Sequence, residues 1–580
     1  MKKIPGNYII YEIIVIVCLL LNIAHTHQRI MDFSQIHHVI YPIDHICFFF
    51  FEVFSVFALS YIIPKYKKIS LLILYVLTTI VLWINIGYSR YFDTYLPLSL
   101  YGEFNNLNGL LPNILDAIEY DDLFFLITSI FVIFAYLISN KSNNFKYNHI
   151  PLYFLFIAFS VSFLYYTYWI SEIKKASLEH YKQFGDQRTI WDFMENHWHS
   201  LNNNNHTSAY HYYGIGLNLF FNGIVKLFKS NQFSFTDGEE SIIKSHIVTT
   251  KYDFPKDSSQ NIIFIIVESL CSYPINKTFG GIEITPNINK TLSSAYYNPK
   301  MKCETKLGES SDGQFIYMTG LLPLNNSVTI NEISKDTITT FISIAKKKTL
   351  HMHSQMVIPT KEYNWSQSSM CKKYGIDSLY SRDSYLQECY GEWLNDKQVF
   401  ELAEKTDFNV QPPFINFILT LSMHSPYIES IEPCGIEYPS DFSQELKHYL
   451  DNVHYTDKYL GQYLESIKKY DWYNNCTIII VADHKPNGPK LNYNNLSLFS
   501  DLPLIIINPP CDFKNKVDYR VISQTSLFPT LLDILQIDSK WRGVDQSIFM
   551  PDSIRNTDYE LERIQHKENI SNYVLNNYLQ

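Results

Sequence analysis

The sequence lacks the cysteine pairs and the basic charge that mark two large classes of protein. Its nine cysteines include no Cys-x-x-Cys pair, which argues against a zinc ribbon or a thioredoxin-like motif. Asp and Glu outnumber Lys and Arg, and the formal net charge of -10 argues against a nucleic-acid-binding protein. At 580 residues the chain exceeds one ordinary domain, so we expect at least two structural units.

Long apolar segments rich in aromatic residues fill the first third of the chain instead. Aromatic residues make up 16% of the sequence, and this concentration is typical of a membrane region with interfacial rings. A membrane-spanning helix needs about 20 predominantly apolar residues. Five segments qualify, and we therefore predict a five-helix transmembrane domain over residues 1–170, with spans at 8–24, 45–63, 69–88, 123–139 and 152–170.

The basic residues of this region indicate its orientation. They cluster before the first span and in alternate loops, at Lys2, Lys3, Lys65, Lys67, Lys68, Lys141 and Lys146. The positive-inside rule then places the N-terminus in the cytoplasm and everything after residue 170 outside a bacterial cytoplasmic membrane. Residues 171–257 form a predicted juxtamembrane connector. Its apolar stretch 214–228 is too broken for a sixth span; if it did cross, the following domain would be cytoplasmic.

Residues 258–550 alternate strand and helix patterns, as an α/β domain does. Two short runs rich in Ile and Val, 261–267 and 477–482, are typical of buried strands in a parallel sheet. Further strands are expected at 414–421 and 503–508. The remaining residues, 551–580, form a predicted polar C-terminal tail.

Ligand-type side chains follow the two buried strands directly. Glu268 comes after the first strand, and Asp483 and His484 come after the second. Active sites of open α/β sheets lie beyond the carboxyl ends of the strands, so we expect the three side chains to converge. Two carboxylates and one imidazole suit a divalent metal such as zinc or manganese.

These residues belong to a set of motifs that carries a family resemblance. The set comprises Val-Glu-Ser at 267–269, Gly-Glu-Ser-Ser-Asp-Gly-Gln-Phe at 308–315, Ser-Met-His-Ser-Pro-Tyr at 422–427, Val-Ala-Asp-His at 481–484 and Leu-Phe-Pro-Thr-Leu-Leu-Asp at 527–533. In this order, and after the predicted spans, they make nearly the whole chain resemble the lipoteichoic acid synthase-like phosphoglycerol transferases. That family belongs to the alkaline phosphatase and sulfatase superfamily, which implies a sulfatase-like α/β fold for residues 258–550.

The resemblance implies a role for each site residue. The hydroxyl at the position of Ser310, usually a threonine in the family, is the nucleophile and a metal ligand together with Glu268, Asp483 and His484. Metal coordination is one way to activate a hydroxyl at neutral pH. Manganese fits the family, while zinc and magnesium stay open. His424 matches an active-site histidine that holds a phosphate oxygen or protonates the leaving alkoxide.

The substrate-binding positions depart from the family pattern. The family grips the glycerol headgroup with Trp-x-Arg, whereas this chain has Trp365 and then Gln367. The loss of a bidentate phosphate donor leaves the identity of the headgroup open. Ser311 is an alternative nucleophile to Ser310. A sulfatase proper is not expected, because the sequence at Cys271 does not fit the Cys/Ser-x-Pro-x-Arg context that formylglycine formation needs.

The resemblance implies a membrane-bound, metal-dependent phosphoglycerol transferase. Ser310 would take the headgroup from a phosphatidylglycerol-type donor, forming a covalent phospho-serine intermediate. An acceptor glycan, glycolipid or polymer of the cell envelope would then receive it. Two alternatives stay open: a phosphoethanolamine transferase of the same superfamily, and a catalytically inactive sulfatase-fold membrane protein. No nucleic-acid partner is expected, and the oligomeric state stays open.

Overall fold

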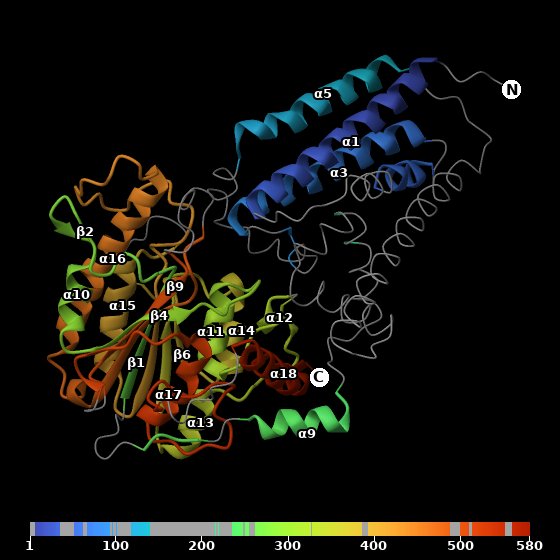
Figure 1. Ribbon diagram of the computed structural model, residues 1–580. Coiled ribbons are helices and arrows are strands. Elements are labelled where there is room, and N and C mark those ends of the chain that lie inside the picture. Colours follow the sequence, from blue (N-terminus) through green and yellow to red (C-terminus); the bar gives the residue numbers. More distant parts are fainter. Residues whose placement is uncertain are drawn as a thin grey trace, which may run out of the picture. The chain divides into compact units, whose positions relative to one another are not determined.

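The computed structural model consists of two compact units, one of apolar helices and one of α/β type (Figure 1). The first unit comprises residues 1–104 and 111–230, and the second comprises residues 105–110 and 231–580. The structure describes residues 6–34, 52–61, 66–92, 95–96, 100, 118–139, 215, 219, 235–247, 250–253, 261–325, 327–385, 393–487, 499–509, 513–551 and 560–579.

Three helices among the described residues of the first unit are long and apolar enough to cross a membrane. The candidate spans are Tyr8–Ile30, Lys67–Arg90 and Tyr120–Ile138. They lie in α1 (Gly6–Ser34), in α3 (Lys67–Phe92), and in α5 (Leu123–Ile138) with the short η4 (Tyr120–Asp122) before it. These helices contain the first, third and fourth predicted spans. Residues 52–60 of the second predicted span are helical, while the rest of it and all of 152–170 lie outside the described residues.

A buried asparagine joins these three helices. The Asn22 side chain of α1 donates to the Tyr75 hydroxyl and to Thr79 Oγ1 of α3, at 3.3 and 3.2 Å. Its carbonyl oxygen accepts a hydrogen bond from Thr128 Oγ1 of α5, at 2.9 Å. Polar side chains within apolar helices typically face other helices rather than lipid, so Asn22 fixes how the three pack.

The second unit is built on a mixed β-sheet. Its nine described strands follow the order β10-β4-β9-β8-β1-β7-β5-β6, with β11 also paired to β4. The strands are β1 (Asn261–Val267), β4 (Tyr296–Lys302), β5 (His353–Val357), β6 (Ser378–Tyr380), β7 (Phe414–Leu419), β8 (Cys476–Ala482), β9 (Asp501–Ile507), β10 (Lys516–Val517) and β11 (Ile522–Ser523). A small hairpin pairs β2 (Thr278–Phe279) with β3 (Ile282–Glu283).

The centre of the sheet is parallel, as the apolar runs predict. Strands β8, β1, β7, β5 and β6 are parallel to their neighbours in that order. All residues of β1, β7 and β8 are buried, because these Ile-rich strands are covered on both faces. The whole sheet is mixed, because β9, which corresponds to the expected strand at 503–508, pairs antiparallel with both β8 and β4.

Helices cover both faces of the sheet (Figure 1). One face carries α10 (Pro286–Leu292), α15 (Asp396–Asn409) and α16 (Gln444–Ile467), and the other carries α11 (Ser310–Thr319), α13 (Phe341–Lys348), α14 (Gln367–Tyr374) and α17 (Leu527–Ile534). The remaining α-helices of this unit are α9 (Asp237–Ser245), α12 (Thr329–Glu332) and α18 (Glu560–Leu579). Single 3-10 turns are η5 (Asn364–Ser366), η6 (Arg382–Ser384), η7 (Tyr473–Asn475) and η10 (Gln524–Ser526).

The polar C-terminal segment contributes a packed helix. In α18, Ile570 and Leu575 are buried within the hydrophobic core of the second unit. The Ser571 hydroxyl accepts a hydrogen bond from the Leu322 amide at 2.9 Å, and Lys567 Nζ lies 3.0 Å from Glu304 Oε1. The segment that the sequence presents as a polar tail is therefore held to the α/β unit by buried apolar and charged contacts.

Candidate metal and headgroup site

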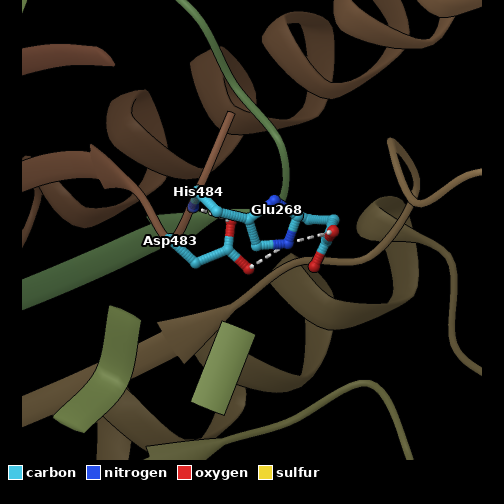
Figure 2. Close-up of side chains that lie close together, drawn as sticks. All are labelled: Glu268, Asp483 and His484. Atoms are coloured by element: carbon cyan, nitrogen blue, oxygen red, sulfur yellow. Dashed lines mark hydrogen bonds and ion pairs between the residues drawn. The ribbon is translucent and has the colours of Figure 1, made fainter. Parts of the chain in front are cut away.

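The three ligand-type residues predicted from the sequence meet at one edge of the sheet. Strands β1 and β8 are paired in parallel with Val267 opposite Ala482, so the residues that follow them begin side by side. Glu268 Oε1 lies 3.3 Å from His484 Nε2, and Asp483 Oδ2 lies 3.6 Å from the same nitrogen (Figure 2). All three residues are buried, at 3–5% exposure. The strand register thus joins residues that are more than two hundred positions apart.

The donor set of this cluster fits a divalent cation. Ligand atoms of Glu268, Asp483 and His484 all lie within 4.8 Å of one another. Two ligands at about 2.0–2.2 Å from a tetrahedral ion are separated by roughly 3.4 Å, close to the separations above. Ser310 Oγ lies 3.1 Å from His484 Nε2 and 3.3 Å from Glu268 Oε2, so this hydroxyl can complete the set. The four side chains can therefore hold one ion.

The three side chains of the cluster differ in the direction of their pKa shifts. Burial opposes ionisation of Glu268, but the adjacent His484 outweighs it and lowers the pKa of Glu268 to about 2. Burial and the nearby Glu268 carboxylate raise the pKa of Asp483 to about 7. Burial disfavours charged His484, yet Asp483 and Glu268 hold the pKa of this imidazole well above its ordinary value. Such closely packed acids favour a positive charge between them, supplied by protons or by a cation.

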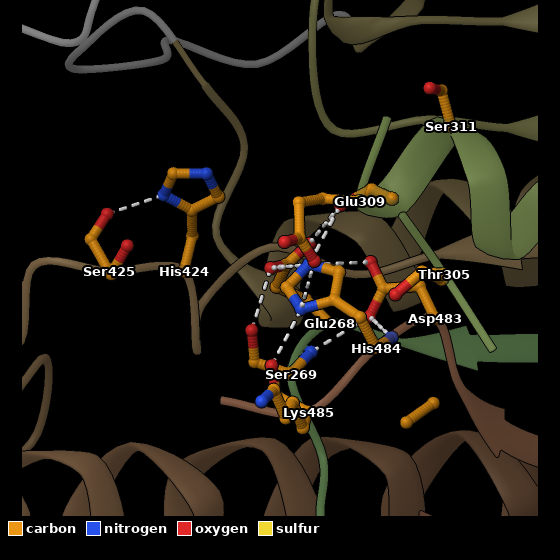
Figure 3. A network of polar contacts seen from close by, with 12 residues as sticks. Glu268, Ser269, Thr305, Glu309, Ser311, His424, Ser425, Asp483, His484 and Lys485 are labelled. Atoms are coloured by element: carbon orange, nitrogen blue, oxygen red, sulfur yellow. Dashed lines mark hydrogen bonds and ion pairs between the residues drawn. The ribbon is translucent and has the colours of Figure 1, made fainter. Parts of the chain in front are cut away.

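Hydrogen bonds from neighbouring groups orient the ligands. Ser269 donates its hydroxyl to Glu268 Oε1 and its backbone N–H to Asp483 Oδ1, both at 2.9 Å (Figure 3). The other ring nitrogen of His484, Nδ1, lies 2.7 Å from the Lys485 carbonyl oxygen. An imidazole that donates Nδ1–H to a carbonyl presents Nε2 as the ligand atom, so this contact selects the tautomer that metal binding needs.

Ser310 occupies the first position of α11. Gly313 in the next turn packs on β8 so closely that a Cβ added there would lie 2.6 Å from the Asp483 carbonyl oxygen. This approach brings the helix N-terminus, which favours anionic groups, to the carboxylate cluster. Ser311, the alternative nucleophile, donates its hydroxyl to the Gly308 carbonyl at 2.7 Å and lies apart from the cluster (Figure 3).

Unfavourable backbone conformations flank the cluster. Ser269, directly after Glu268, has a φ of 53°, and Glu309, directly before Ser310, has a φ of 41°. Trp365 and Ser366 also have positive φ values, of 48° and 57°. Positive φ is uncommon for residues other than glycine, and it concentrates at functional sites where surrounding contacts enforce it.

An aromatic group lies on the loops that follow β5, β6 and β7. The rings of Trp365 and His424 are stacked with centroids 6.0 Å apart, at an interplanar angle of 24°. Trp393 contacts both of them, at 5.9 Å from Trp365 and 5.8 Å from His424. His424 Nδ1 is hydrogen-bonded to the Ser425 carbonyl oxygen (Figure 3). We call Trp365, Trp393 and His424 the aromatic wall.

Comparison with known families identifies both parts of the chain. Residues 1–189 match the lipoteichoic acid synthase N-terminal domain, and residues 260–537 match the sulfatase domain. The chain belongs to the lipoteichoic acid synthase-like family. The relatives named below are lipoteichoic acid synthases, and this chain is an enzyme of the same phosphotransferase class.

The chain is similar to two curated proteins and to one solved structure. The lipoteichoic acid synthase of Staphylococcus saprophyticus is 24% identical over 490 residues, which cover 80% of this chain and 72% of that protein. Lipoteichoic acid synthase 2 of Bacillus subtilis is 25% identical over 352 residues, covering 54% of this chain and 52% of that protein. A crystal structure of a lipoteichoic acid synthase from Listeria monocytogenes aligns with a TM-score of 0.49 and 16% identity, covering 58% of this chain and 98% of that one.

The structure of this family member includes side chains near the cluster that the sequence motifs did not single out as site residues. Ser269 donates hydrogen bonds to Glu268 and Asp483, and the carboxylate of Glu309 lies 3.6 Å from His484 Nδ1. Trp393 contacts His424 although no motif includes it. The sequence could have indicated Ser269 and Glu309, because each is adjacent to a predicted ligand. It offers no such signal for Trp393. Gln367, predicted to bind substrate, is 5% exposed, and its Oε1 has no hydrogen-bond partner among the described residues.

Proposed function

We propose that this enzyme is a membrane-bound, metal-dependent transferase that moves a phospho-headgroup from a phosphatidylglycerol-type lipid to a cell-envelope glycan, glycolipid or polymer. The observation that carries the proposal is the position of Ser310. Its hydroxyl stands at a helix N-terminus within 3.3 Å of both a ligand carboxylate and the ligand imidazole. A hydroxyl in such surroundings is suited to attack phosphorus.

Glu268, Asp483, His484 and Ser310 would hold one divalent cation, with manganese as the expected ion and zinc or magnesium as the other candidates. When bound, such an ion supplies positive charge that lowers the pKa of a hydroxyl and neutralises phosphoryl oxygens. The protein holds the ligands for it rigidly, because two of them follow paired, fully buried strands. Buried carboxylates need this compensation, since unpaired charge in a protein interior is costly.

In the first half-reaction, Ser310 Oγ attacks the phosphorus of the donor lipid. A bond forms between Oγ and phosphorus, and the bond from phosphorus to the diacylglycerol oxygen breaks. Ser310, which is half-buried, releases its proton to water, and His424 protonates the departing diacylglycerol oxygen. The products are diacylglycerol and a phospho-headgroup ester on Ser310.

The second half-reaction reverses these roles. An acceptor hydroxyl attacks the phosphorus and gives its proton to His424, which restores the imidazolium. Ser310 Oγ leaves, takes a proton from water and regenerates the free enzyme. The α11 N-terminus faces the phosphoryl group in both steps and favours its negative charge.

The apolar helices of the first unit explain why the donor would be a lipid. Three candidate spans anchor the chain in a membrane, and a domain held there stays close to the headgroups of its donor. The basic residues before the first span and in alternate loops favour an extracytoplasmic site, where envelope polymers are assembled.

A phosphoethanolamine transferase is the second candidate. Two side chains favour it: the buried, neutral Gln367 stands where the family has arginine, and Glu309 places a third carboxylate beside the cluster. An additional carboxylate suits an ammonium group better than it suits glycerol hydroxyls.

The test is release of diacylglycerol by the purified full-length enzyme from vesicles of phosphatidylglycerol or of phosphatidylethanolamine, with and without Mn²⁺. We expect metal-dependent release from one of the two lipids. Ser310→Ala should abolish it, whereas Ser311→Ala should retain most of it, because Ser311 only closes the turn at Gly308. Full activity of Ser310→Ala would overturn the proposal, and the lipid consumed decides between the two headgroups.

A further inference from the structure

Trp393 presents a buried hydrogen-bond donor that has no acceptor among the described residues. Its indole Nε1 is shielded from solvent and has no partner among the described residues. An indole N–H can only donate, so the missing partner must be an acceptor. Buried polar groups left without a partner are uncommon in folded proteins, and each one calls for a bound molecule or a functional reason.

The rings around this indole N–H belong to the aromatic wall, whose Trp365 and His424 are the predicted headgroup-binding residues. Trp393 lies edge-on to His424, with ring centroids 5.8 Å apart and an interplanar angle of 61°. It also lies 5.9 Å from Trp365, whose left-handed backbone turns the ring into the same group. Figure 3 shows His424 to the left of Glu309 and the ligand cluster. The proposed mechanism places the phosphoryl group between His424 and that cluster.

Asp396, three residues after Trp393, ties its loop to the loop of His424. The backbone N–H of Asp396 donates to Ser422 Oγ at 2.8 Å. Its carboxylate Oδ1 accepts the backbone N–H groups of Leu421 and Ser422, both at 2.9 Å. These bonds link the start of α15 to the segment just before His424, and Asp396 itself is fully buried.

A second anchor holds the loop from the other side. The Leu394 amide donates to the Pro359 carbonyl oxygen at 2.8 Å, next to the end of β5. Asn395 caps α15 by accepting the Gln398 amide at 3.1 Å. Trp393 is thus fixed between the loops after β5 and β7, and the geometry is built in before any ligand arrives.

From this placement we infer that Trp393 is a headgroup-positioning residue, whose indole N–H donates a hydrogen bond to an anionic phosphoryl oxygen of the donor. The inference rests on the proposed function. It assigns a hydrogen-bond donor for the phosphoryl group to the side of the site where Gln367 replaces the family's arginine. Phosphoglycerol and phosphoethanolamine both carry the phosphoryl oxygen, so Trp393 would serve either donor.

Trp393→Phe tests the inference, because it keeps a ring in the aromatic wall and removes only the N–H. Losing one hydrogen bond to a charged oxygen should weaken binding roughly tenfold. Kinetics of the full-length enzyme on vesicles of each lipid should show KM raised roughly tenfold with kcat within about twofold. Calorimetric titration with glycerol phosphate and with phosphoethanolamine should show the same loss, independently of turnover.

Trp472→Phe is the matched control. Trp472 packs on Phe414 at the first residue of β7, the end of that strand opposite to His424. Its replacement should leave KM and both affinities unchanged. Unchanged values for Trp393→Phe would overturn the inference, as would binding of neither titrant to the wild type. A drop in melting temperature with unchanged affinity would assign Trp393 a structural role instead. Binding without turnover would contradict the proposed function and leave the inference intact.

Discussion

The ligand cluster and the aromatic wall lie at the same edge of one sheet, yet they are built differently. Glu268, Asp483 and His484 are attached directly to paired strands, and the register of β1 and β8 sets their separation. Trp365, Trp393 and His424 stand on loops several residues beyond β5, β6 and β7, positioned by side-chain anchors such as Asp396. We infer that the two regions have different roles. The residues at the strand ends would position the metal and the nucleophile, and the residues on the loops would position the substrate headgroup.

The largest effect should come from the strand-end cluster. Asp483→Asn keeps the shape of the side chain but removes the charge of one ligand. Changes in groups that merely orient ligands typically cost 10- to 100-fold, so losing a ligand should reduce activity by more than roughly a hundredfold and release the metal. Metal analysis of the purified protein and diacylglycerol release measure both. Asp471→Asn, an exposed position, should behave as wild type; a fully metallated Asp483→Asn would remove Asp483 from the ligand set.

The next variant should show that the aromatic wall and the ligand cluster have independent functions. His424→Gln removes a proton donor without touching a ligand, so kcat should fall roughly 100- to 10,000-fold while metal content is unchanged. His353→Gln is the matched control, because His353 begins β5 at the opposite end of the sheet and pairs with Asp377. Loss of metal in His424→Gln would show that the two regions are not independent.

A gain of positive charge at Gln367, two residues after Trp365 of the aromatic wall, should sharpen the choice between the two donor lipids. Gln367→Arg restores the bidentate cation of the family pattern, so KM for phosphatidylglycerol should fall roughly tenfold relative to phosphatidylethanolamine. Gln367→Met, similar in size and uncharged, controls for repacking of this buried position. Equal effects on both lipids, or equal behaviour of the two variants, would exclude Gln367 from headgroup discrimination.

The last effect is on stability rather than activity and concerns a buried carboxylate away from this edge. Asp407 accepts hydrogen bonds from Gln355, Asn416 and Tyr463, and burial raises its pKa from 3.8 to about 6. A raised pKa means that the folded state holds the proton more tightly, so the contribution of Asp407 to stability declines as pH rises from about 4 to about 6, by about 3 kcal/mol. Melting temperatures of wild type and Asp407→Asn across this range should diverge in slope; parallel curves would refute the assignment.

The convergence of Glu268, Asp483 and His484 could be predicted from the sequence because its signal is local. The runs before Glu268 and Asp483 are continuous and apolar, and a parallel sheet brings the ends of such strands together. The same argument could not find the antiparallel direction of β9, since a buried strand has the same apolar pattern in either direction. Strand direction is set by the connection, which periodicity does not reveal.

The wall residues were less predictable for a related reason. Trp365 and His424 were identified through the family resemblance, whereas Trp393 was missed because its partners come from loops distant in sequence. Its anchor, Asp396, makes contacts 25 and 26 residues away that no local pattern encodes. The packing of α18 was missed similarly, because buried Lys567 is stabilised by Glu304, far from it in the chain.

Mass spectrometry of peptides from the full-length enzyme, quenched during turnover of phosphatidylglycerol or phosphatidylethanolamine vesicles, tests the covalent mechanism most directly. The mechanism predicts one phospho-headgroup on the peptide that contains Ser310, metal-dependent and absent in Ser310→Ala. Diacylglycerol release with no adduct on Ser310, or with an adduct on another residue, would contradict it.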